Sequence, residues 1–228
     1  MQTDSIEQPS YTVAVDCVIF TYMHDTLHIA LIERRNDPFA GMCAVPGGLL
    51  EAAETVEQAA ARELKEETGL EPMYLEQFHV FSAPDRDPRG HVISVAFFGL
   101  IPADTGELVA QTDAQRAHWH PVTNLPELAF DHGTIIAQAR NALTITAHIK
   151  PIICNLLLQY FTRAMLERIY KAVSNEDVDT ATVHEHVAQA QGIEKTHLYT
   201  HDENQRPEQL YTCNPQRCTG TPLLLPRI

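Results

Sequence analysis

GLLEAAETVEQAAARELKEETGL, residues 48–70, combines a helical segment with a glycine at each end. Residues 53–68 are mostly Ala, Glu, Arg and Leu and contain no Gly or Pro, which predicts a helix. Thr55 is the expected N-cap and Gly69 the expected C-cap. The apolar residues at i, i+4 and i+8 are expected to form the buried stripe of this helix: Val56, Ala60 and Leu64.

Three glutamates in this segment, Glu63, Glu66 and Glu67, follow the spacing i, i+3 and i+4. On a helix this spacing places all three carboxylates on one face. Like charges so close repel each other unless a cation lies among them, and Mg²⁺ or Mn²⁺ prefers such oxygen ligands. These ions bridge phosphate oxygens and activate water. The glutamates alone would favour a solvated, glutamate-rich helix, whereas the residues around them favour a metal site.

The neighbouring residues add groups that such a site needs. The Gly47–Gly48 pair permits close approach of the backbone, and a carbonyl there could add a metal ligand. Arg62 can reach Glu54 or Glu66 on the same side of the helix and hold a carboxylate in position. The segment therefore predicts a metal site with an arginine supporting its ligands.

The whole stretch resembles the signature of the Nudix hydrolase family, G-x5-E-x7-R-E-U-x-E-E-x-G-U, where U is a bulky aliphatic residue. The nine specified positions are Gly48, Glu54, Arg62, Glu63, Leu64, Glu66, Glu67, Gly69 and Leu70. The resemblance covers roughly residues 11–145. It implies a loop–helix–loop inside an α/β/α sandwich, and metal-assisted attack of water on a diphosphate linkage.

By position, the resemblance assigns metal binding to Glu63, Glu66, Glu67 and the carbonyl of Gly47. It assigns Glu54 to metal-bound water and to pairing with the arginine. The implied catalytic set is Glu54, Arg62, Glu66 and Glu67. The general base stays open, because relatives use a downstream loop glutamate where this chain offers the aspartates 85 and 87, and a helix glutamate could act through metal-bound water.

Two further segments, 81–98 (FSAPDRDPRGHVISVAFF) and 128–143 (LAFDHGTIIAQARNAL), resemble a subgroup of this family. The subgroup contains ADP-ribose pyrophosphatases and the NrtR regulators of NAD metabolism. The resemblance implies hydrolysis of ADP-ribose, or a related nucleoside diphosphate derivative, to AMP and ribose 5-phosphate. Another substrate, such as a dinucleotide polyphosphate or NADH, stays open.

The loop at residues 84–90 supplies candidate phosphate ligands. Arg86 and Arg89 could reach the diphosphate, because a planar guanidinium suits phosphate oxygens. Alternatively, both arginines pair with Asp85 and Asp87 in an exposed loop. Arg35, at the end of an expected strand, is a further candidate of the same kind.

Segments rich in β-branched and aromatic residues, separated by polar turns, predict the remaining strands. Strands are expected at 11–22, 27–35, 73–83 and 91–101, a short strand and turn at 117–130, and a helix at 131–146. This order indicates an α/β fold, an α/β/α sandwich with a mixed sheet. The expected division is a tail at 1–10, a Nudix domain at 11–146, and a small winged-helix-like domain with an irregular C-terminal tail at 147–228.

The C-terminal unit is expected to contain a helix at 161–173 capped by Thr162, a second helix at 182–191, and a hairpin at 197–213. FTRAMLERIYKAV and RPEQLY resemble the winged-helix domain of NrtR, which gives an alternative function: a transcriptional regulator that senses ADP-ribose. The second helix, within DTATVHEHVAQAQG, carries Glu185 and no Arg or Lys between residues 181 and 192. Such a helix should repel DNA, so the sequence favours the enzyme, and the unit could equally serve dimerisation.

Composition limits the remaining classes of function. Residues 1–145 carry 21 acidic and 8 basic side chains, and residues 146–228 carry 9 and 8, so neither part has the basic excess of a strong nucleic-acid binder. Five cysteines without a CxxC pair argue against a disulfide framework. No secretory signal or membrane-spanning stretch is present, so a cytoplasmic protein is expected. The family resemblance implies a homodimer.

Overall fold

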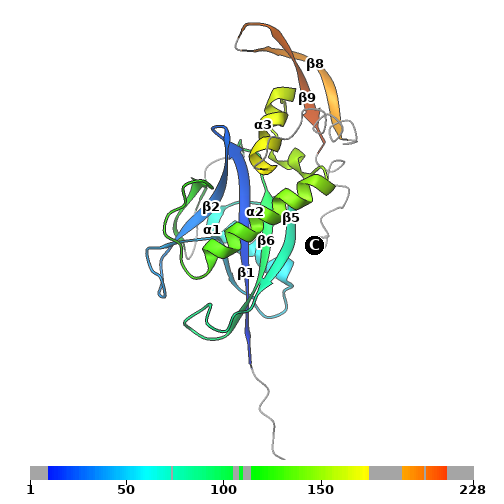
Figure 1. Cartoon of the computed structure of the whole chain (residues 1–228). Coiled ribbons are helices and arrows are strands. Elements are labelled where there is room, and N and C mark those ends of the chain that lie inside the picture. Colours follow the sequence, from blue (N-terminus) through cyan, green and yellow to red (C-terminus); the bar gives the residue numbers. More distant parts are fainter. Residues whose placement is uncertain are drawn as a thin grey trace, which may run out of the picture.

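The computed structural model describes residues 10–72, 74–104, 108–109, 114–174, 192–202 and 204–214. Figure 1 shows one mixed sheet, crossed by α2 on one face and α1 on the other, with α3 and a β-hairpin beyond one end. The predicted α/β class is confirmed. No helix in these described ranges combines the length and apolarity that crossing a membrane requires.

Within the described residues, seven strands form the sheet. They are β1 Thr12–Met23, β2 Thr26–Arg34, β3 Cys43–Ala44, β4 Gly47–Leu49, β5 Tyr74–Phe81, β6 Val92–Leu100 and β7 Ala114–Pro121. Their order is β3-β2-β1-β6-β5, with β4 paired to β1 and β7 paired to β2. β1 runs parallel to β6 and antiparallel to β2 and β4, so the expected mixed sheet is confirmed. The four longer N-terminal strands lie where the sequence predicted them, whereas the short strands β3 and β4 were not predicted.

β1 separates the two halves of the core. Successive side chains of a strand point to opposite faces of the sheet. Cys17 and Ile19 pack in the cluster that contains the apolar residues of α1, whereas Val18 and Phe20 pack in the cluster under α2. A strand that is apolar on both faces is therefore buried between two helical layers, as a sandwich requires.

α1, Val56–Thr68, begins directly after the predicted N-cap Thr55, and a capping box fixes this N-terminus. The Thr55 hydroxyl accepts from the backbone N–H of Gln58, and the Gln58 side chain accepts from the N–H of Thr55. Gly69 ends the helix at φ 74°, as predicted. Ala60 and Leu64 are buried as expected, whereas Val56 is only partly buried.

The C-terminal elements pack against the same core as the sheet. They follow α2 His132–Ile149 and comprise the 3-10 helix Ile152–Leu156, α3 Arg163–Ser174, and the hairpin of β8 Ile193–His201 and β9 Pro207–Cys213. Phe161, Leu166 and Ile169 belong to the cluster that also contains residues of β1. The predicted boundary at residue 147 lies within α2.

Two predictions for the C-terminal unit are confirmed, the helix beginning after Thr162 and the hairpin. The Thr162 hydroxyl accepts from the backbone N–H of Met165, as an N-cap does. The predicted second helix at 182–191 lies outside the described residues, as do the tail at 1–9 and the C-terminal segment 215–228. The winged-helix prediction depends on that second helix and stays a prediction.

Candidate functional site

The glycine turn, residues 45–48, follows β3 and includes the glycine pair that begins β4. It meets both β1 and α1 at distances that only glycine permits. A Cβ atom on Gly48 would lie 2.1 Å from Oε1 of Glu63, and one on Gly47 would lie 2.1 Å from the carbonyl oxygen of Val15. The N–H of Gly47 donates to Oε2 of Glu67 at 2.8 Å. The glycine pair therefore brings the backbone against the carboxylates of α1, as the sequence led us to expect.

Arg62 joins the carboxylates of the site. Its Nε and Nη2 donate to both oxygens of Glu54 at 3.1 and 2.7 Å, and its Nη1 donates to Glu63 at 2.7 Å. Nη1 also lies 3.5 Å from Glu66, and Nη2 donates to the carbonyl of Leu49. The pKa of Arg62 is raised, chiefly by the hydrogen bond to Glu54. The guanidinium therefore stays charged and holds the end of β4 to α1.

The three glutamates of the predicted metal site differ in their exposure. Glu67 is buried, the Glu63 side chain is 13% exposed, and the Glu66 side chain is 42% exposed. Gly47, Glu63 and Glu67 line a common cavity, whereas Glu66 lies beside Arg62 outside that lining. Hard carboxylate oxygens beside a close backbone turn fit a divalent cation such as Mg²⁺. Among the described residues, however, no three acidic, histidine or cysteine side chains form a ready-made ligand cluster.

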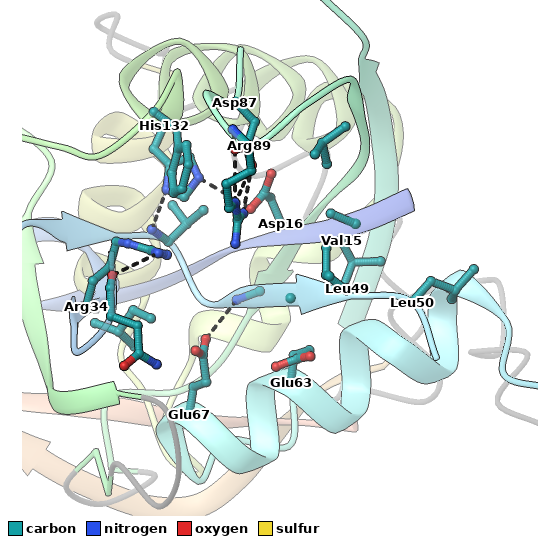
Figure 2. A pocket seen from close by; sticks show the side chains of 18 of the residues that line it. Val15, Asp16, Arg34, Leu49, Leu50, Glu63, Glu67, Asp87, Arg89 and His132 are labelled. Carbon is teal, nitrogen blue, oxygen red and sulfur yellow. Dashed lines mark hydrogen bonds and ion pairs between the residues drawn. The ribbon is translucent and has the colours of Figure 1, made fainter. Parts of the chain in front are cut away.

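The cavity has a volume of about 400 Å³, which suits a small-molecule ligand. Figure 2 shows Glu63 and Glu67 on its lower wall, Arg34 and His132 towards the left, and Leu49 and Leu50 towards the right. The apolar end is lined by Ala14, Val15, Leu49, Leu50 and Val92. The cations on the lining are Arg34, Arg35, Arg86 and Arg89. Carboxylate, cationic and apolar surfaces thus face the same space.

Arg86, a predicted phosphate ligand, lines this cavity but is bound to carboxylates of the protein. Its Nε and Nη2 donate to the two oxygens of Asp131 at 3.0 and 2.6 Å, and Nη2 donates to Asp16 at 3.2 Å. The Arg86 side chain is only 4% exposed. Burial opposes its charge, but the hydrogen bond to Asp131 and the charge of Asp16 keep its pKa raised. The expected alternative partners, Asp85 and Asp87, are not the residues it binds.

Arg89 pairs with Asp87, as one of the two sequence interpretations expected. Its Nη2 donates to Asp87 at 2.7 Å, and its Cζ lies 5.6 Å from the centre of the Phe130 ring. Burial alone would raise the pKa of Asp87, but the hydrogen bonds from Arg89 hold it below the ordinary value. An aspartate held in this way is a poor general base. Asp85 is exposed and does not line the cavity, and the exposed Arg35 does line it.

Arg34 lines the cavity, although it was not predicted as a site residue from the sequence. Its Cζ lies 4.8 Å from the centre of the Phe130 ring, and its Nε donates to the carbonyl of Pro38 at 2.9 Å. Burial lowers the pKa of Arg34, and the nearby charge of Arg89 lowers it further. The available signal was its position at the end of a strand, which it shares with the selected Arg35.

Asp16 and His132 were also missed, and both line the cavity, on the side opposite Glu63 and Glu67 in Figure 2. Asp16 accepts a hydrogen bond from the Ser94 hydroxyl, and its Oδ1 lies 3.4 Å from Nε2 of His132. The N–H of Val45 donates to Nδ1 of His132 at 3.0 Å. Burial lowers the pKa of His132, against the charges of Asp16 and Asp131. The one local signal was Asp16 itself, a charged residue inside an apolar strand.

Comparison with known proteins identifies relatives of two kinds. A family model described as the NUDIX domain matches residues 10–139. The ADP-ribose pyrophosphatase of Methanocaldococcus jannaschii is 51% identical over 124 residues, which cover 54% of this chain and 70% of that protein. The ADPR responsive transcriptional repressor NtrR of Acinetobacter baylyi is 29% identical over 214 residues, covering 92% and 85% respectively. The crystal structure of Shewanella oneidensis NrtR complexed with a 27mer DNA is similar at a TM-score of 0.76 and 29% identity, covering 90% and 95%.

Proposed function

The chain belongs to the Nudix hydrolase family, and from that premise we propose that it hydrolyses the diphosphate linkage of ADP-ribose to AMP and ribose 5-phosphate. The observation that carries the proposal is the carboxylate wall of the cavity, where Glu63 and Glu67 face the same space as the backbone of Gly47. The 51% identity to an ADP-ribose pyrophosphatase supports this choice of substrate.

A divalent ion fits the donor groups of this wall. Glu63, Glu67 and the carbonyl of Gly47 would hold Mg²⁺, or Mn²⁺ in its place, and Glu66 completes the proposed ligand set from beside Arg62. When bound, the ion would bridge phosphate oxygens, neutralise developing charge and lower the pKa of water. We assign the general base to Glu66 or Glu67, which belong to the proposed ligand set on α1. Asp87 is held by Arg89, and the exposed Asp85 neither lines the cavity nor belongs to that set.

In this proposal the remaining residues either orient carboxylates of the site or bind the substrate. Arg62 fixes Glu54 through two hydrogen bonds and so holds it close to the carboxylate wall. Arg35 and Arg89 offer guanidinium groups to the diphosphate from the cavity lining. Arg86 contributes through the carboxylates that it holds, because three of its N–H groups, on Nε and Nη2, bind Asp131 and Asp16. The apolar end at Leu49 and the residues around it suits an uncharged part of the nucleoside.

AMP release from ADP-ribose, measured by chromatography with Mg²⁺ and separately with Mn²⁺, tests the proposal. NADH and a dinucleotide polyphosphate serve as competing substrates in the same panel. We expect Glu67→Gln to lower turnover by about 100-fold or more, since it removes a charge from the wall. Glu57→Gln is the matched control, because Glu57 is an exposed glutamate of the same helix. Purified wild-type protein that releases no AMP with either ion contradicts the proposal.

A second candidate function is an ADP-ribose-responsive repressor. The matches to NtrR and to the DNA-bound NrtR structure span 92% and 90% of this chain, whereas the pyrophosphatase match spans 54% of it. Residues 181–191, which the sequence predicts to be helical, contain no Arg or Lys and lie outside the described residues. The charge of that segment favours the enzyme, and the length of these matches favours the repressor.

A gel-shift assay with the DNA upstream of the chain's own gene separates the two candidates. Specific binding that weakens with salt and with added ADP-ribose would support the repressor. Absence of binding at low salt, together with AMP release, would support the enzyme alone. Light scattering in the same buffer would measure the homodimer that we also propose.

A further inference from the structure

The turn that carries Gly47 is attached to α2 through one long-range hydrogen bond. Val45 is 2% exposed, and its N–H donates to Nδ1 of His132 at 3.0 Å, across 87 positions of sequence. A buried N–H without an acceptor is strongly disfavoured, so His132 supplies the acceptor that this part of the turn requires. Val45 packs in the cluster under α2, whereas Gly47, two residues later, donates to Glu67 of α1.

The orientation of the His132 ring is fixed from its other nitrogen. Because the Val45 N–H occupies Nδ1, the ring proton belongs on Nε2, which faces Oδ1 of Asp16 at 3.4 Å. Asp16 is held in turn by the Ser94 hydroxyl and by Nη2 of Arg86. The imidazole is therefore held at both nitrogens, by the Val45 N–H of the glycine turn at Nδ1 and by Asp16 of β1 at Nε2.

Arg86 also binds the residue at the N-terminus of α2. It binds both oxygens of Asp131, the residue immediately before His132, and one oxygen of Asp16. The guanidinium thus joins the start of α2 to β1. The Arg86 side chain is buried, and three of its N–H groups donate to these carboxylates. Rotation of Asp131 or Asp16 would therefore take a partner away from the buried charge of Arg86.

A second attachment lies just upstream of the first. The N–H of Ala129 donates to the carbonyl of Cys43 at 2.8 Å, and Leu128 forms a parallel bridge with Cys43. The segment before α2 therefore holds the chain at residue 43 as well as at Val45. Two attachment points fix the direction in which the chain enters the glycine turn.

We propose that His132 is a positioning residue: from α2, it sets the glycine turn against Glu67 and thereby the geometry of the carboxylate wall. A Cβ on Gly47 would lie 2.1 Å from the Val15 carbonyl, so the turn has no spare room on the β1 side. Loss of the bond to Val45 would let the turn move away from α1, which lengthens the bond between Gly47 and Glu67. The inference rests on the proposed function, because it assigns Gly47 and Glu67 to the metal.

Two substitutions of His132 separate its two nitrogens. In His132→Asn the side-chain oxygen occupies the place of Nδ1 and can still accept from Val45. In His132→Gln the longer amide can reach Asp16 in the place of Nε2, but nothing accepts from Val45. The readouts are hydrogen exchange of the Val45 and Gly47 amides by NMR, the Mn²⁺ dissociation constant without nucleotide, and kcat and KM for ADP-ribose.

We expect His132→Gln to weaken Mn²⁺ binding and to lower kcat by about 10-fold or more, as loss of a residue that orients metal ligands does. Exchange at Val45 and Gly47 should accelerate, and KM should change little. His132→Asn should restore slow exchange and most of the Mn²⁺ affinity. Equal losses in both variants, or unchanged exchange at Gly47 in His132→Gln, would overturn the inference.

A milder variant tests the same inference in case His132→Gln does not fold. Ser94→Ala removes one of the donors that hold Asp16, and we expect it to change exchange at Val45 and the Mn²⁺ affinity in the same direction, by less. No change in either quantity would overturn the inference. Wild-type protein that releases no AMP contradicts the proposed function alone, because amide exchange in the variants still decides the role of His132.

Discussion

Arg62 holds Glu54 with two parallel hydrogen bonds, from Nε at 3.1 Å and from Nη2 at 2.7 Å. The same guanidinium donates to Glu63 and to the carbonyl of Leu49. A lysine carries the same charge but cannot form this planar, two-bond contact while reaching the other two groups. The arginine therefore contributes geometry as well as charge.

From this contact we predict that Arg62→Lys lowers kcat for ADP-ribose by about 10- to 100-fold, because Glu54 and Glu63 lose a fixed orientation. Steady-state kinetics of AMP release measure the effect. Lys65→Gln is the control, since Lys65 is an exposed residue of the same helix that pairs with Glu71, just beyond the end of the helix. Full activity in Arg62→Lys would show that charge alone suffices.

Gly48→Ala tests the close contact between β4 and α1. Its Cβ would lie 2.1 Å from Oε1 of Glu63, so the carboxylate must move out of its present position. We expect turnover to fall by about 100-fold, the effect of misplacing a reacting group by roughly an ångström. Mn²⁺ titration should show weaker binding in parallel. Gly133→Ala is the control, because a Cβ there meets only Leu128 at 3.9 Å.

The parts of the fold that were predictable depend on local patterns. The β-branched and aromatic composition of β1 and the helical composition of α1 are visible within a few residues, so both were located from sequence. β3 and β4 have two and three residues, too few to show any period, and were missed. Both ends of α1 were predicted correctly, because the N-cap Thr55 and the C-cap Gly69 are local signals that the sequence displays directly.

The same limit applies to the site. Arg62 and the glutamates lie within one helix, so their spacing alone indicated that they meet. Arg86 was expected to pair within its own loop, yet its partners Asp16 and Asp131 lie 70 and 45 positions away. His132 meets Val45 across 87 positions. Contacts of this range depend on the packing of the whole sheet, and one sequence contains no local pattern that reports them.

Arg86→Met tests whether Arg86 stabilises the fold. Its side chain is 4% exposed and holds two carboxylates, so we expect unfolding free energy to fall by about 3–5 kcal/mol, the cost of leaving buried charges unpaired. Chemical denaturation measures the loss. Lys65→Met is the comparison, because Lys65 and its partner Glu71 are both exposed, and it should cost far less. Equal stability of the two variants would contradict this role.

Acidification should destabilise the protein through His132. Burial lowers its pKa from the ordinary value of 6.5, although Asp16 and Asp131 oppose the shift. The unfolded chain therefore binds the proton more readily, so stability is full above about pH 6.5 and falls as the pH drops towards the lowered pKa, by at most about 1.4 kcal/mol per pH unit. Urea unfolding between about pH 5.5 and 7.5 should show a steeper loss in wild type than in His132→Asn, which keeps the Val45 acceptor without the titration. Parallel profiles of unfolding free energy against pH would mean that His132 binds its proton equally in the folded and unfolded states. Other titrating groups, such as His120, contribute equally to both proteins and cancel in the comparison.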